Sequence, residues 1–166
     1  MGADLYIRSI HDKANAEHMP KFNTAAKVRD ALIEAKVDQS EIDLAQEVVT
    51  KHYDAMYDHG GYFRDSYNST SLFWQLGLSW WGDTASYINS NGKIVPSKAK
   101  LLLEWLKSRT LAVPTLDSLK GAKVSLDPNS EDSLQAWHEF FIAKKKRFED
   151  FIQTAIDLNE PIDCSI

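Results

Sequence analysis

Cysteine is almost absent from the chain, with Cys164 the single one among 166 residues. Because a disulfide needs two cysteines and cysteine-based zinc sites need several, an internal disulfide and a cysteine-rich metal site are both excluded. The HExxH motif of zinc enzymes and the Glu-x-x-His pairs of helical di-iron sites are absent too. The sequence therefore predicts no metal and no cofactor.

Histidines and carboxylates do gather in one region, at His52, Asp54, Asp58, His59 and Asp65. A helix through this region would point His52 toward its apolar side, and Asp54 and Asp58 toward the opposite side. A single metal ion cannot be bound by side chains that lie on opposite sides of one helix. We therefore interpret the group as a histidine at the edge of the core beside a solvated acidic face.

The loops that hold phosphate groups, GxxxxGK[ST] and GxGxxG, do not occur in the sequence, and neither does the GxSxG elbow of α/β-hydrolases. Nucleotide binding through such loops is thus excluded, and hydrolase chemistry has no support. These absences favour a non-catalytic protein, although such motifs cover only part of known enzyme chemistry.

Long apolar runs and an excess of positive charge are also missing. The most apolar segment, Ser69–Trp81, is shorter than the roughly 20 residues that span a bilayer, and the N-terminus lacks the pattern of a signal peptide. The formal net charge is −5, which disfavours nucleic acid as a partner. The one basic run, 144–147, would spread around a helix, with Lys144 and Lys145 partly lining its apolar seam and extending their charged ends to solvent. We expect a cytoplasmic protein without membrane or nucleic-acid partners.

Apolar residues recur at helical spacing over much of the chain, which predicts a mainly α protein. We expect a single domain, 1–166, built as a bundle of about five helices with up to three short β-strands. The expected strands lie at Ala3–Ile10, near Lys93 and near Lys123, whereas 110–129 has no clear pattern. The expected helices are Pro20–Lys36, Glu41–Asp58, Ser69–Trp81, Pro96–Arg109 and Ser130–Leu158.

The bundle is predicted to surround an aromatic-rich core helix at Ser69–Trp81. This segment is apolar nearly all round, which is typical of a buried helix. Asn68 would cap its N-terminus. Leu72, Leu76 and Trp80 are expected to be almost wholly buried.

The segment just before this helix is the predicted site. Gly60-Gly61 breaks the preceding helix, and aromatic residues then alternate with charged ones. Arg64 could hold a carboxylate or phosphate group through its planar guanidinium, with tyrosine rings as stacking faces. The competing interpretation is an internal ion pair of Arg64 with a carboxylate. The candidate ligand-binding residues are His59, Tyr62, Arg64, Asp65 and Tyr67.

Two functions follow from these observations. The first is a non-catalytic interaction or binding protein whose partner is another protein or a second copy of the chain. The second is an enzyme or a binder of a small anionic ligand, with its site around Arg64, Asp65 and Tyr67.

Overall fold

The computed structural model describes residues 2–67, 70–79, 82–115, 119 and 131–165. The chain divides into two compact units, one formed by Met1–Ile7 with Phe63–Ile166 and the other by Arg8–Tyr62. Among the described residues there are five α-helices and four strands, so the predicted mainly α class is confirmed. No helix in this part of the chain is long and apolar enough to cross a membrane. The single-domain expectation stays a prediction.

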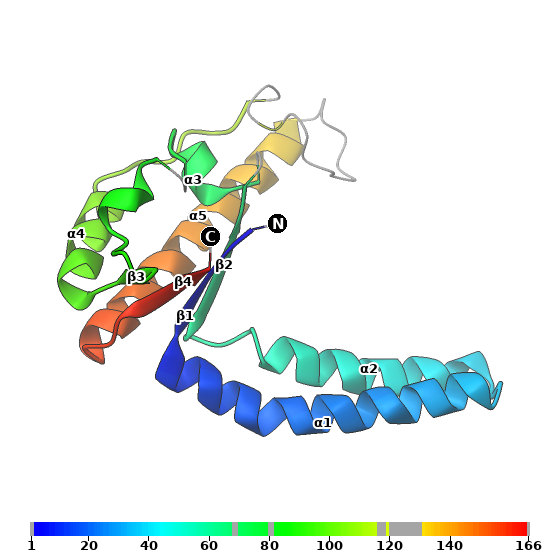
Figure 1. Ribbon diagram of the computed structural model, residues 1–166. Helices are drawn as coiled ribbons and strands as arrows, with labels where there is room; N and C mark the ends of the chain where they lie inside the picture. The colour runs from blue at the N-terminus through cyan, green and yellow to red at the C-terminus, as the bar shows by residue number, and fades with distance from the viewer. Residues whose placement is uncertain (1, 68–69, 80–81, 116–118, 120–130, 166) are drawn as a thin grey trace. The chain divides into compact units, whose positions relative to one another are not determined.

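The larger unit contains a four-stranded antiparallel sheet with the strand order β2-β1-β4-β3 (Figure 1). In its centre, Leu5 of β1 lies opposite Cys164 of β4, and Ile7 lies opposite Ile162. The strand nearest the N-terminus thus pairs with the one nearest the C-terminus. The strands are β1 (Gly2–Ile7), β2 (Tyr62–Ser66), β3 (Lys93–Ile94) and β4 (Ile162–Ser165).

Successive side chains of β1 alternate between the two faces of the sheet. Ala3, Leu5 and Ile7 are fully buried, whereas Asp4 and Tyr6 are only partly covered. Two amphipathic helices, α4 (Pro96–Lys107) and α5 (Glu131–Asp157), pack against each other in this unit. The largest buried side chains here are Leu5, Ile7, Phe63, Leu72, Phe73, Ile94, Leu102, Leu106, Phe141, Phe148 and Ile152.

The prediction of a long core helix at Ser69–Trp81 is wrong. Helix α3 covers only Leu72–Gln75, and Gly77 follows it with a φ of 75°, a left-handed conformation that suits glycine and ends a helix. Ser71 caps the helix, accepting the N–H of Trp74. Because the chain turns here, Leu76 is only half-buried. Asn68, Trp80 and Trp81 lie outside the described residues.

Two strands of the sheet, β2 and β4, were not predicted, so the sheet exceeds the expected three strands. β2 occupies the predicted site segment, and β4 follows the long helix α5. The strand expected near Lys123 lies outside the described residues, as does most of 110–129. The strand near Lys93 is confirmed as β3, and the strand near the N-terminus is confirmed as far as Ile7.

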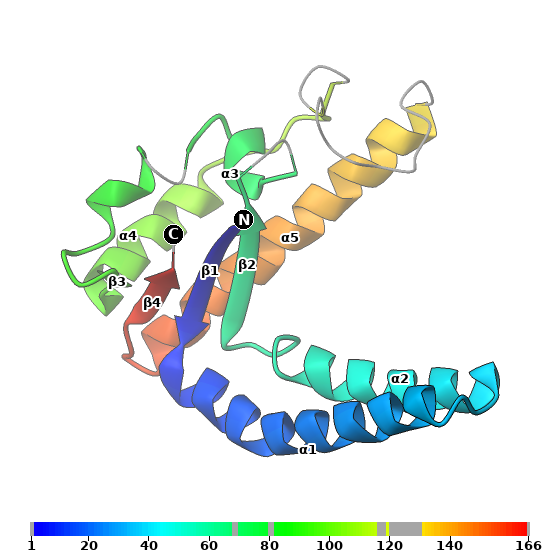
Figure 2. The same cartoon turned by 45° about the vertical axis from the view of Figure 1, so that its right-hand side comes forward.

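The smaller unit is a hairpin of two helices, α1 (Arg8–Glu34) and α2 (Gln39–Ala55) (Figure 2). The predicted start at Pro20 is wrong because α1 begins at Arg8 and carries Pro20 in its interior. A proline there removes a backbone hydrogen bond, which is why it is read from sequence as a helix start. Lys36, with a φ of 53°, forms the turn between the helices. The two helices pack against each other along their length.

Candidate functional site

The predicted site residues fall into the two units. Arg64, Asp65 and Tyr67 belong to the unit that contains the sheet, whereas His59 and Tyr62 belong to the hairpin unit. Arg64 and Asp65 are neighbours in β2, so their side chains point to opposite faces of the sheet. Each group is therefore described with its own unit.

Arg64 lies at the surface. Its side chain is 59 % exposed, and its Nε lies 3.6 Å from the carboxylate of Asp4. Asp4 also raises the pKa of Tyr67, second to the effect of burial. The structure thus gathers Arg64 and Tyr67 around Asp4, a residue of β1 that sequence reasoning did not associate with them. Ligand binding by these residues stays a prediction.

Asp65 is the buried charge of this segment. Its carboxylate accepts hydrogen bonds from Ser71 Oγ at 2.7 Å and from the backbone N–H groups of Leu72 at 2.9 Å and Phe73 at 3.3 Å. These N–H groups open α3 and have no partner within the helix. Asp65 therefore ties β2 to the beginning of α3.

Lys144 completes this group from α5. Its Nζ donates to Asp65 Oδ1 at 2.5 Å and to the carbonyl oxygen of Thr70 at 3.1 Å. The side chain of Asp65 is fully buried and that of Lys144 is 14 % exposed. The predicted extension of the Lys144 ammonium group to solvent is wrong, because this group pairs with the carboxylate of Asp65, and a buried carboxylate requires a charged or hydrogen-bonding partner. Both carboxylate oxygens of Asp65 accept hydrogen bonds from within the protein, which suits a structural role.

His59 and Tyr62 join an aromatic group at the base of the hairpin. The ring of His11 stacks on Tyr62 at a centroid distance of 5.8 Å, and its Nδ1 lies 3.3 Å from Nε2 of His59. Tyr57 meets Tyr62 edge-on at 5.0 Å. A side chain at Gly61 would lie 2.5 Å from Cβ of Ile10, so this close approach requires glycine. Sequence reasoning missed His11, since only the fold brings it to His59.

We expect the hairpin to lose stability as the pH falls below about 6.5. Burial and then His59 lower the pKa of His11, despite an opposing effect of Asp12, and desolvation followed by His18 lowers the pKa of His52. A histidine whose pKa is lower in the folded state stabilises the fold above its unfolded pKa. That contribution disappears as the pH falls from the unfolded to the folded pKa.

Amide hydrogen exchange measures this effect, with opening free energies corrected for the pH dependence of the intrinsic exchange rate. Protection of α2 should fall between about pH 8 and pH 5, whereas α4, whose sequence has no histidine, serves as the internal reference. Equal changes in the two helices would contradict the prediction.

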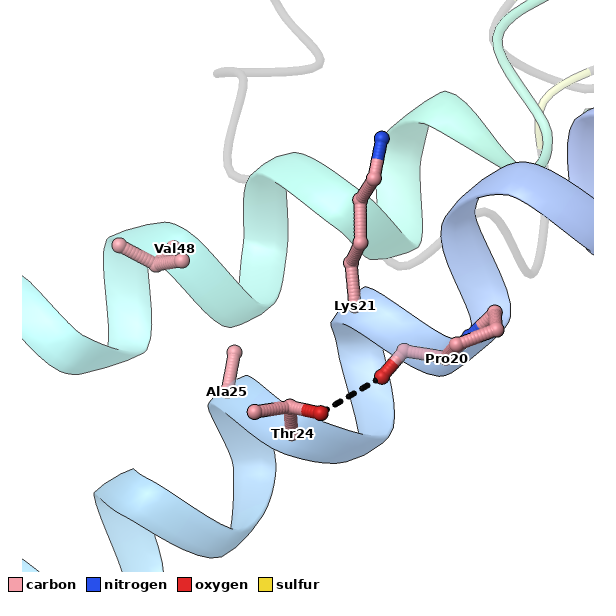
Figure 3. Close-up of a pocket in the computed structure, with 5 residues that line it drawn as sticks. All are labelled: Pro20, Lys21, Thr24, Ala25 and Val48. Carbon is pink, nitrogen blue, oxygen red and sulfur yellow. Dashed lines mark hydrogen bonds between the residues drawn. The ribbon is translucent and has the colours of Figure 1, made fainter.

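The hairpin also carries a hollow on one of its sides. It has a volume of about 390 Å³ and is lined by residues of both helices. Figure 3 shows these side chains: Pro20, Lys21, Thr24, Ala25 and Val48. Val28 and Leu44 extend the same side by one helical turn each, since they follow Thr24 and precede Val48 by four residues. We call Pro20, Thr24, Ala25, Val28, Leu44 and Val48 the hairpin face.

Apart from Thr24, the residues of the hairpin face are apolar, and the face is open to solvent. Val28 is 52 % exposed, Leu44 63 % and Val48 46 %. All 27 residues of α1 are described, and none of them is buried. Two helices can cover only the seam between them, so their outer sides stay accessible to a third element.

Comparison with known proteins gives no relative from which a role could be transferred: no family model, no curated protein and no solved structure matches the chain significantly.

Proposed function

We propose that the protein is a non-catalytic interaction protein that pairs with a second copy of itself through the hairpin face. The main support is α1, a 27-residue helix without a buried residue. Isolated helices depend on tertiary packing of an apolar face for most of their stability. A second hairpin placed on this face would supply that packing as an antiparallel four-helix bundle.

The charges of the two helices favour a second copy of the chain as the partner that binds the hairpin face. Helix α1 carries five basic and four acidic side chains, whereas α2 carries one basic and four acidic. A two-fold dimer brings the same surface of both copies together, so α1 of one copy can lie beside α2 of the other. The helix with a net positive charge then lies beside the helix with a net negative charge.

Val48→Glu is expected to abolish this association, because it places a charge in the centre of the hairpin face that a dimer would bury unpaired. Sedimentation equilibrium should show a concentration-dependent dimer for the wild type and a monomer for Val48→Glu. Circular dichroism should show that the variant keeps its helices, as expected for a position that is 46 % exposed.

Leu101→Glu is the matched control. Leu101 lies on α4 in the other unit and is 51 % exposed, so the same charge is added at a similarly accessible apolar residue. This variant should dimerise like the wild type. A wild type that is monomeric at every concentration, or an equal effect of the two substitutions, would overturn pairing through the hairpin face.

A further inference from the structure

We propose that His18 and His52 form a two-histidine binding site for a first-row divalent metal ion such as Zn²⁺, bridging α1 and α2. The Nδ1 atoms of the two rings lie 3.3 Å apart. Two nitrogens bound to one tetrahedral zinc ion at about 2.0–2.1 Å are separated by about 3.3 Å. The spacing of the pair therefore already fits an ion held by both rings.

The surroundings of His18 leave Nδ1 available to the ion. Its Nε2 lies 3.7 Å from the carboxylate of Glu17. A carboxylate on that side favours the proton on Nε2, which leaves the lone pair on Nδ1, and metal-bound histidines commonly have such an outer carboxylate. In the absence of metal, the Nδ1–H of His52 can donate to Nδ1 of His18. A bound ion replaces this single proton.

The site is accessible, since the His18 side chain is 22 % exposed. Imidazole nitrogens suit zinc, copper and nickel.

The second histidine pair has the same spacing but a different hydrogen-bonding pattern. His11 Nδ1 and His59 Nε2 also lie 3.3 Å apart. However, the backbone N–H of Gly61 donates to Nδ1 of His59 at 3.0 Å. A neutral ring that accepts there carries its proton on Nε2, 2.9 Å from the carbonyl oxygen of Met56. This nitrogen is a donor and cannot bind an ion, so we expect no metal at this pair.

A site with only two protein ligands leaves the other coordination positions of the ion open. No group of three or more histidine, cysteine, aspartate or glutamate side chains suited to a metal exists among the described residues. Water or an external ligand would complete the coordination of the ion. Cys164 is a weak competitor, because burial and the nearby Asp163 raise the pKa of its thiol to about 12.

Isothermal titration of the full chain with Zn²⁺ tests this site. The wild type should bind one ion per chain, and His18→Gln and His52→Gln should each lose most of the affinity, since each leaves a single imidazole. His59→Gln removes one ring of the other pair and His138→Gln removes a histidine outside both pairs, so these two variants should bind like the wild type. Circular dichroism checks that every variant is folded.

Nuclear magnetic resonance locates the ion independently of affinity. Addition of Zn²⁺ should shift the ring resonances of His18 and His52 and leave those of His11 and His59 in place. No heat of binding in the wild type, or an equal loss in His59→Gln and His18→Gln, would overturn the proposal. Because the readouts are stoichiometry and ring shifts, the result does not depend on whether the protein dimerises.

Discussion

Asp65→Ala is expected to lower the free energy of unfolding by about 3–5 kcal/mol, the range for breaking a buried ion pair. The substitution leaves the ammonium group of Lys144 without its carboxylate in a place where its side chain is 14 % exposed. It also removes the acceptor of two backbone N–H groups at the start of α3. A buried donor without an acceptor is destabilising by itself.

Arg64→Ala is the matched control, since it alters the neighbouring residue of the same strand. The ion pair of Arg64 with Asp4 is exposed to solvent, and such pairs contribute about 0–1 kcal/mol. Urea unfolding of both variants provides the measurement. A loss below about 1 kcal/mol for Asp65→Ala would show that the buried pair is unimportant for the fold.

A double variant, Asp65→Ala with Lys144→Met, separates the two parts of this effect. Removal of both charges should be less destabilising than the sum of the single variants, because neither charge is left buried and unpaired. An additive result would show that the two residues do not interact in solution.

Phe148→Ala is expected to lower the free energy of unfolding by about 3–5 kcal/mol. Phe148 is fully buried on α5, and its ring stacks on Phe63 of β2 at a centroid distance of 4.3 Å. It also meets Phe73 of α3 edge-on at 5.8 Å. Removal of this ring would therefore leave a cavity between β2, α3 and α5. A shift of any single one of these elements would not fill it.

Phe140→Ala provides the comparison on the same helix. Phe140 is 46 % exposed and contacts the rings of Trp137 and Phe141, so its removal should destabilise by about 1 kcal/mol. The two variants differ in burial but not in chemistry. Similar losses in urea unfolding would mean that Phe148 does not occupy the core in solution.

Much of the helical structure could be predicted because apolar residues recur at helical spacing within each segment. α2, α4 and α5 each carry an apolar stripe beside polar positions, and their predicted ends differ from the observed ones by a few residues. The alternation of β1 was equally informative. Such patterns arise because one face is buried and the other is solvated.

The failures lie where a local pattern has more than one solution. An apolar run such as Ser69–Trp81 has no polar face to fix its conformation, and Gly77 allowed a turn. Strands as short as β4 carry too few residues for a visible period. Asp65 was named as a site residue, but its partner Lys144 is 79 positions away. Only the packing of α5 onto α3 brings such residues together.

The pairing of β1 with β4 affects how the chain acquires its fold during synthesis. β4 leaves the ribosome after every other described element, yet it lies between β1 and β3 in the sheet. β1 and β3 therefore have no common neighbour until translation has passed residue 165. The helical hairpin relies on contacts between adjacent segments, which form quickly. On the nascent chain the hairpin helices can therefore form before β1 gains its second neighbour, and until then the unpaired edge of β1 is a site for aggregation.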